Sequence, residues 1–202
     1  KGVGALFVRR GIALRPIIYG GGQEKRLRSG TENVAGIVGL ATAFQIVQSE
    51  RETESARLAV LRDRLIAGIQ TRIPKVVLNG HPTERLPNNV NVSILDVEGE
   101  ALLLYLDAVG ISAATGSACD SASLDPSHVI LAIGRPYEFA HASIRFTLGR
   151  ATTEADVDYV LEQLPPIVEK LRAISPVKMS LDGTITGSAS AFVGDGRPHW
   201  EH

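Results

Sequence analysis

Cysteine is almost absent from this chain: Cys119 is the only one among 202 residues. A single cysteine excludes an internal disulfide and predicts a reducing compartment, the cytoplasm. The net charge of −1 favours neither nucleic acid nor a membrane surface as a partner. No apolar run approaches the roughly 18 residues that span a bilayer, and we expect no secretory leader. With 44% hydrophobic and 21% charged residues, the composition is typical of a globular protein.

The segment around the cysteine, residues 114–123, contains only small or polar side chains. Such side chains bury little apolar area, so we expect an exposed loop here rather than core. An exposed thiol is available to ionise, and the thiolate is the nucleophilic form. The alternative is an inert thiol that packs as a small hydrophobic side chain. The residues alone leave both interpretations open.

A second unusual segment combines three glycines, residues 20–22, with the start of a helix. Consecutive glycines predict a loop, and the spacing of Ser29 and Glu32 predicts a capping box. Exposed N–H groups at a helix start, with nearby hydroxyls and cations, would form an anion site. The side chains concerned are Ser29, Thr31, Arg26 and Arg28. The alternative is a solvated basic loop before an ordinary helix cap.

Hydrophobic periodicity predicts alternating strands and helices, and hence an α/β fold. Strands are predicted at residues 5–8, 14–19, 76–78, 89–95, 111–113 and 143–148. Helices are predicted at residues 34–73, 99–109 and 127–133, and after a Thr152 or Thr153 cap. Pro165 and Pro166 should kink or split this last helix.

The long predicted helix is polar on all sides in its middle, residues 49–54. A polar waist between two amphipathic halves predicts a helix that bridges two packed bodies, with a boundary near residue 50. After Pro176 the composition shifts to Gly, Ser, Thr and Asp. This shift predicts an extended, loosely held tail at residues 176–202.

Four stretches of the sequence, in order and spacing, resemble one family. They are residues 1–6, residues 20–24 with 28–33, residues 116–119 with 121–123, and residues 143–146 with 148–150. On these stretches the chain resembles the C-terminal half of the pyridoxal-phosphate-dependent cysteine desulfurases. The long cysteine loop resembles group I, the iron–sulfur-assembly type within the class V aminotransferases.

The resemblance implies a fold-type I transferase, represented by the end of its large domain and its small C-terminal α/β domain. Residues 1–50 would complete the large cofactor-binding domain and begin the bridging helix. Residues 51–175 would form the small domain with the catalytic cysteine loop. Residues 176–202 would be the tail, which carries Trp200 and is a candidate docking surface for a partner.

Three residues match functional positions of that family. Cys119 matches the cysteine that takes sulfur from L-cysteine as a persulfide and leaves L-alanine, and it could transiently bind a nascent cluster. Arg145 matches the arginine that pairs with the substrate carboxylate; without the resemblance it is an ordinary strand arginine that extends to solvent. Thr31 matches a residue that reaches the phosphate of pyridoxal phosphate, the implied cofactor, in the neighbouring subunit.

The resemblance therefore implies a homodimer that passes sulfur to an iron–sulfur scaffold protein or another acceptor, with no nucleic-acid or membrane partner. We interpret Arg28 and Arg150 as structural or supporting residues. The spacing of His81, His128 and His141 is not that of metal ligands, so no resident metal site is predicted.

One departure from the family concerns the lysine that bonds to the cofactor. Its position would lie shortly before Lys1, which matches a later lysine of the family's Gly-Pro-Lys-Gly turn. We therefore expect this chain to be a fragment that is inactive alone. An alternative is a non-catalytic module that accepts sulfur on Cys119 or binds a partner. Another is an enzyme of the same fold that acts on selenocysteine, which has the same carboxylate and amine.

Overall fold

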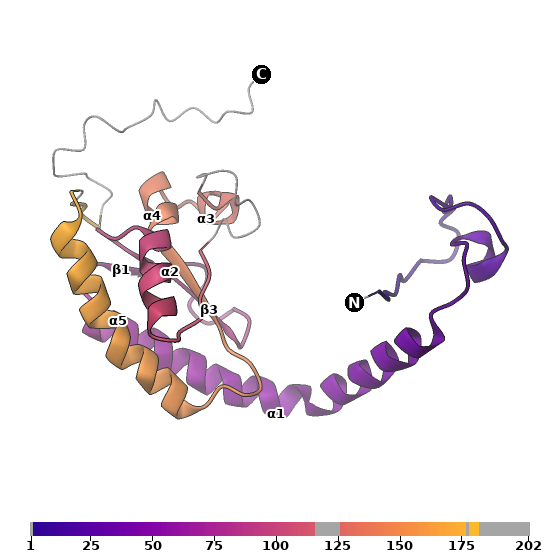
Figure 1. Cartoon of the computed structure of the whole chain (residues 1–202), viewed down its shortest axis with the longest axis horizontal. Coiled ribbons are helices and arrows are strands. Elements are labelled where there is room, and N and C mark those ends of the chain that lie inside the picture. The colour runs from indigo at the N-terminus through magenta and orange to yellow at the C-terminus, as the bar shows by residue number, and fades with distance from the viewer. Residues whose placement is uncertain (1, 116–125, 177, 182–202) are drawn as a thin grey trace, which may run out of the picture. The chain divides into compact units, whose positions relative to one another are not determined.

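The structure is a computed structural model that describes residues 2–115, 126–176 and 178–181 (Figure 1). The order of elements is η1 (Gln23–Arg26), α1 (Val34–Arg72), β1 (Val76–Leu78), β2 (Asn89–Ile94), α2 (Gly99–Ala108), α3 (His128–Ala132), α4 (Tyr137–His141), β3 (Ser143–Thr147) and α5 (Glu154–Ile174). Helices and a small sheet are mixed, as the α/β prediction requires.

The chain divides into two compact units, Lys1–Thr53 and Glu54–His202, and the division falls within α1. The long helix predicted at residues 34–73 is confirmed as α1. The finer division into residues 1–50, 51–175 and 176–202 stays a prediction.

The first unit buries none of its described side chains. The strands predicted at residues 5–8 and 14–19 are wrong, because both segments lack regular structure. A short apolar run becomes a strand only where a neighbouring strand pairs with it, and no strand lies among the described residues of this unit. Side chains such as those of Phe7 and Ile17 are consequently exposed.

The second unit is organised by a three-stranded antiparallel sheet in the order β1-β2-β3. The register pairs Val77 with Ser93 and Val92 with Ile144. Alternation in β2 and β3 places one set of side chains on a buried face, as the sequence pattern predicts. The fully buried members of this set are Val90, Val92, Ile94 and Ile144.

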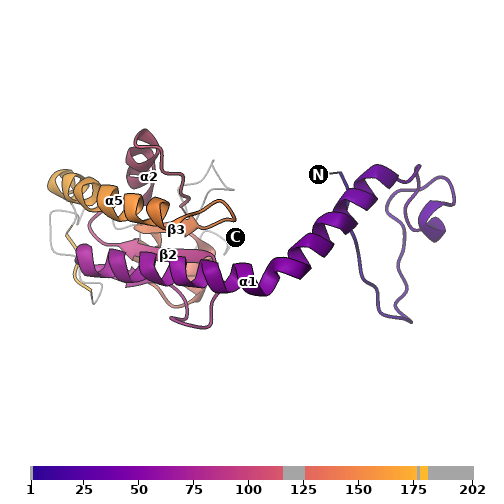
Figure 2. The ribbon, with the colours of Figure 1, turned by 90° about the horizontal axis from the view of Figure 1, so that it is seen from below.

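Three helices complete the core of the second unit. The part of α1 from Leu58 onward, α2 and α5 bury their apolar side chains together with those of the sheet. Helices α1 and α5 lie side by side in both views (Figures 1 and 2). They approach closely at Gly68, where a Cβ would lie only 2.6 Å from Leu161 Cδ2. The absence of a side chain at Gly68 therefore permits the contact.

Helix α5 runs without interruption through Pro165 and Pro166, so of the predicted kink or split the split is wrong and the kink stays a prediction. Pro165 has no N–H to donate to the carbonyl of Leu161, one turn earlier. The side chain of Arg72, at the end of α1, donates to that carbonyl at 2.7 Å instead. A neighbouring helix thus supplies the hydrogen bond that the proline removes.

The start of α5 is a capping box, as its threonines predict. Thr153 Oγ1 accepts from the N–H of Asp156 at 3.2 Å, and the N–H of Thr153 donates to the Asp156 carboxylate at 2.8 Å. The short helix α4 was not predicted, because a single turn shows too little periodicity. No helix among the described residues is long and apolar enough to cross a membrane.

Candidate functional site

Arg145 lies in the middle of β3 and extends its side chain away from the core. Its neighbours Ile144 and Phe146 are buried, so alternation along the strand leaves Arg145 exposed. Within the described part of the chain, no hydrogen bond or ion pair engages its guanidinium group. Five N–H donors are therefore available to an anion such as a carboxylate.

The backbone of Arg145 joins β3 to the segment that leads to the cysteine. Its N–H donates to the Ala114 carbonyl at 2.7 Å, and its carbonyl accepts from the Ala114 N–H at 3.0 Å. This isolated bridge replaces the strand predicted at residues 111–113, which is wrong. Among the described residues that lead to the cysteine, only Ala114 pairs with β3, so this segment does not extend the ladder up to Thr115.

Cys119 lies outside the described residues, as do Lys1 and Trp200. The exposure and the loop conformation of the cysteine segment stay predictions. The described chain reaches Thr115 on one side of that segment and resumes at Pro126 on the other.

The loop before α1 is organised by side chains other than the predicted capping box. Helix α1 starts at Val34, and Asn33 Oδ1 accepts from the N–H of Gly36 at 3.0 Å. Ser29 instead donates its hydroxyl to the Gly21 carbonyl at 3.0 Å, so the box predicted for it is wrong. Gly30, with φ near 106°, lies outside the helical region, so Ser29 cannot be the N-cap of a helix that begins at Gly30.

Thr31 is exposed in this loop, and no hydrogen bond among the described residues engages its hydroxyl. The guanidinium of Arg28 lies against Gly30, where a Cβ would be 2.9 Å from Arg28 Nη1. A hydroxyl and a guanidinium group are both donors that suit a phosphate monoester. Thr31 belongs to the first unit and Arg145 to the second.

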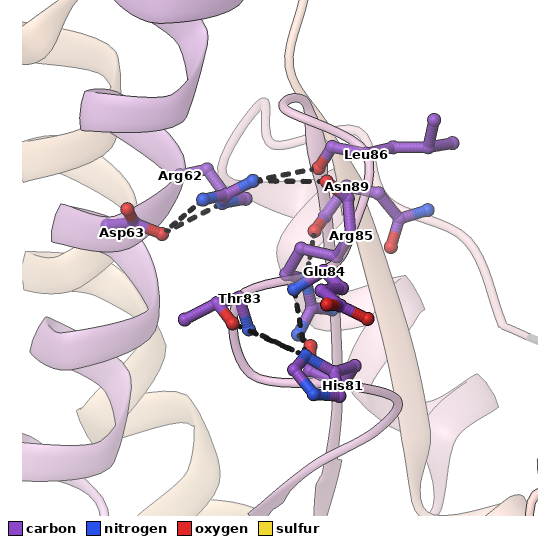
Figure 3. A network of polar contacts seen from close by, with 8 residues as sticks. All are labelled: Arg62, Asp63, His81, Thr83, Glu84, Arg85, Leu86 and Asn89. Carbon is purple, nitrogen blue, oxygen red and sulfur yellow. Dashed lines mark hydrogen bonds and ion pairs between the residues drawn. The ribbon is translucent and has the colours of Figure 1, made fainter.

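His81 organises a turn. Its Nδ1 atom accepts from the N–H of Glu84 at 2.8 Å and from that of Thr83 at 3.2 Å (Figure 3). The side chain of Arg85 donates to the His81 carbonyl at 3.2 Å. Burial is the main cause that lowers the pKa of Arg85, and the nearby charge of Arg62 adds to it.

No cluster of three or more potential metal ligands occurs among the described residues.

The turn that follows β3 is held from α1 by Arg57. This guanidinium donates to the carbonyl of Thr152 at 2.7 Å and contacts two further carbonyls of the turn. The sequence analysis did not single out Arg57. Its partners in the turn are main-chain atoms more than ninety positions later, and no motif signals such a contact.

Comparison with known proteins gives concordant results. The family model described as aminotransferase class-V matches residues 1–160. A cysteine desulfurase IscS of Methanosarcina thermophila is 55% identical over 177 residues, which cover 88% of this chain and 44% of the relative. A cysteine desulfurase IscS of Clostridium botulinum is 54% identical over 179 residues, 88% of this chain and 45% of the relative.

Solved structures show the same relationship. A NifS-like protein superposes with a TM-score of 0.72 and 34% identity, over 81% of this chain and 41% of that protein. A NifS-like protein of Rickettsia africae gives a TM-score of 0.69 and 29% identity, over 78% of this chain and 41% of that protein. The chain spans about half the length of the curated relatives it matches.

Proposed function

Because this chain belongs to the class-V aminotransferase family, we propose that the whole protein is a pyridoxal-phosphate-dependent cysteine desulfurase. It converts L-cysteine to L-alanine and retains the sulfur as a persulfide on Cys119. The observation that carries the proposal is the position of Arg145. Its guanidinium is exposed and has no partner among the described residues, and its backbone is bonded to Ala114, which precedes the cysteine segment.

Arg145 binds the carboxylate of the substrate. A guanidinium group stays charged at every physiological pH and matches a carboxylate with two parallel hydrogen bonds. This geometry fixes the amino acid in orientation as well as in position, which lowers the entropic part of the barrier. The strand β3 supplies a rigid support for the group, because its other face is buried in the core.

Cys119 is the sulfur acceptor. Its thiolate attacks the substrate sulfur, so that a sulfur–sulfur bond forms and the bond between the substrate's Cβ and sulfur breaks. The electron pair of the broken bond stays with the carbon skeleton, which is protonated to give alanine. The cysteine follows Ala114 along the chain, and the backbone allows at most about 3.6 Å per residue. Covalent connection therefore keeps the thiol near the arginine that orients the substrate.

Pyridoxal phosphate supplies an electron sink for the substrate's Cα when it is bound. The residues of the first unit that fit its phosphate are Thr31, whose hydroxyl makes no hydrogen bond among the described residues, and Arg28, whose guanidinium lies against Gly30. In a homodimer, Thr31 of one subunit serves the cofactor of the other. The protein is cytoplasmic and passes the sulfur to an iron–sulfur scaffold or another acceptor, with residues 176–202 as a docking segment.

The proposal is tested with the whole protein loaded with cofactor. We expect alanine and, with a reductant, sulfide to form from L-cysteine in equal amounts. Cys119→Ala should retain the visible absorbance of the bound cofactor and should lose sulfide release. Cys119→Ser is the control that keeps the size of the side chain and removes only the thiol. A loaded protein that releases no alanine from cysteine is not a desulfurase. Faster turnover of selenocysteine would reassign the substrate while keeping the residues' roles.

A further inference from the structure

We propose that Arg57 is a positioning residue for Arg145, acting through the turn between β3 and α5. The inference rests on the proposed function, because it assigns Arg57 to the same substrate site. The side chain of Arg57, on α1, makes hydrogen bonds to three carbonyls of the turn at residues 149–152.

Arg57 binds three carbonyls of that turn. Its Nη1 atom donates to the Thr152 carbonyl at 2.7 Å, and its Nη2 atom donates to the carbonyls of Gly149 at 3.2 Å and Arg150 at 3.1 Å. Glu54, one helical turn earlier, accepts from Nε at 3.0 Å and from Nη2 at 3.1 Å. The carboxylate thus holds the guanidinium in the orientation that faces the turn.

The turn is also bonded within itself and to the strand before it. The N–H of Thr152 donates to the Gly149 carbonyl at 3.0 Å, and the N–H of Gly149 donates to Thr152 Oγ1 at 2.9 Å. Leu148, the last residue before the turn, exchanges two hydrogen bonds with Asn88. A displacement of the turn would therefore also displace the end of β3.

Strand β3 depends on this anchor because it lies at the edge of the sheet. Its inner side is bonded to β2, whereas its outer side is paired at Arg145 alone among the described residues. A shift of the strand end would move the Arg145 side chain and would also strain the main-chain bridge between Arg145 and Ala114. Arg57 consequently helps to fix the position of the Arg145 backbone, from which the guanidinium extends.

Lysine cannot replace arginine in this role. The guanidinium presents five donors in a planar fork, whereas the lysine ammonium presents three donors at one point. It cannot reach Thr152, Gly149 and Glu54 together. Arg57→Lys keeps the charge and loses the clamp, so it separates positioning from electrostatics.

The experiment compares Arg57→Lys and Arg57→Gln with Arg64→Lys in the whole protein. Arg64 is a matched control, because it also lies on α1 and bonds to exposed carboxylates of α5 rather than to the turn. We expect both Arg57 variants to raise KM for L-cysteine about tenfold or more and to change kcat less than about threefold, since carboxylate binding is lost equally in ground and transition states. Arg64→Lys should leave both constants unchanged.

Hydrogen exchange supplies a readout that does not require activity. The amides of Arg145, Ala114 and Thr152 should exchange faster in the Arg57 variants, while those of Leu102 and Asn79, bonded elsewhere, should not. A uniform increase at all five amides, failure of both variants to fold, or an unchanged KM would overturn the positioning role. Absence of desulfurase activity in the wild type would overturn the proposed function instead, and the exchange pattern would then decide the clamp alone.

Discussion

At the scale of single residues, two charged side chains of the second unit, Arg145 and Asp96, differ in burial and in partners. Arg145 is exposed and has no ion-pair partner in the described chain, so its guanidinium is available to bind a ligand. Asp96 is buried, and both of its oxygens are occupied: Lys75 Nζ donates at 2.8 Å and the Met179 N–H donates at 2.6 Å. The first charge is expected to serve binding and the second to serve stability.

Arg145→Lys should therefore weaken substrate binding more than folding. A lysine keeps the charge and loses the two-point geometry, and one charge-assisted hydrogen bond is worth about 1.5–3 kcal/mol. We expect KM for L-cysteine to rise about ten- to hundredfold. Steady-state kinetics measures it, and an unchanged denaturation midpoint confirms that the fold is intact. A wild-type KM in this variant would exclude Arg145 from substrate binding.

The carboxylate of Asp96 should make the folded protein less stable in acid. Burial tends to raise the pKa of Asp96, but hydrogen bonds from Lys75 and the Met179 N–H, together with the positive charges of Lys75 and Arg172, outweigh it and hold the pKa below its usual value. A lowered folded-state pKa stabilises the protein above the unfolded value of about 3.9, and this contribution disappears as the pH falls through the folded-state pKa.

Asp96→Asn should cost about 1–3 kcal/mol near neutral pH and progressively less in acid, as measured by denaturant unfolding. Asp158→Asn is the matched control, because Asp158 pairs with Arg64 at an exposed site and should cost less than about 1 kcal/mol. An equal cost for the two variants at neutral pH would contradict the assigned role of Asp96.

At the scale of elements, α5 depends on a hydrogen bond that it does not make itself. Arg72, at the end of α1, serves the Leu161 carbonyl that Pro165 leaves without an N–H donor. The contact also joins the two helices that pack at Gly68. A proline in a helix interior is thus tolerated because a second helix compensates for it.

Arg72→Ala should cost about 1 kcal/mol in unfolding free energy, the usual net value of one hydrogen bond. The same substitution should cost much less in a Pro165→Ala background, where residue 165 regains an N–H for the Leu161 carbonyl. A double-mutant cycle of denaturant unfolding measures this coupling. Additive effects of the two substitutions would show that Arg72 acts independently of the proline.

At the scale of the whole chain, the two units differ in what they bury. The second contains a continuous core in which residues such as Leu65, Ile69 and Leu106 are almost completely buried. The first buries none of its described residues, although Leu6, Phe7 and Ile17 are all more than 75% exposed. A unit without a core cannot offset the conformational entropy of folding.

Residues 54–181 produced alone should therefore unfold cooperatively and should show a near-ultraviolet circular dichroism signal from ordered aromatic side chains. Residues 1–53 produced alone should show little helix, because most helical stability in proteins comes from packing of an apolar face, and this unit buries none of its described side chains. Far-ultraviolet circular dichroism of the two pieces tests the contrast. A stable, helical first piece would show that its apolar side chains need no further partner.

The sequence by itself determined the elements whose hydrophobic periodicity extends over several turns or residues. Helices α1, α2 and α5 and strands β2 and β3 are confirmed close to their predicted bounds, because the spacing of apolar residues directly encodes which side faces a core. The same holds for the capping box of Thr153, whose partners are all local. Family membership likewise followed from short motifs in order.

Only the tertiary structure decided the features that depend on partners far along the chain. The apolar runs at residues 5–8 and 14–19 form no strand, since none of the described residues pairs with them. The roles of Arg57, Arg72 and Asp96 come from main-chain atoms that packing brings close, and no spacing rule encodes such contacts. Local patterns specify an element, whereas its neighbours, its anchors and the position of its charges arise from packing.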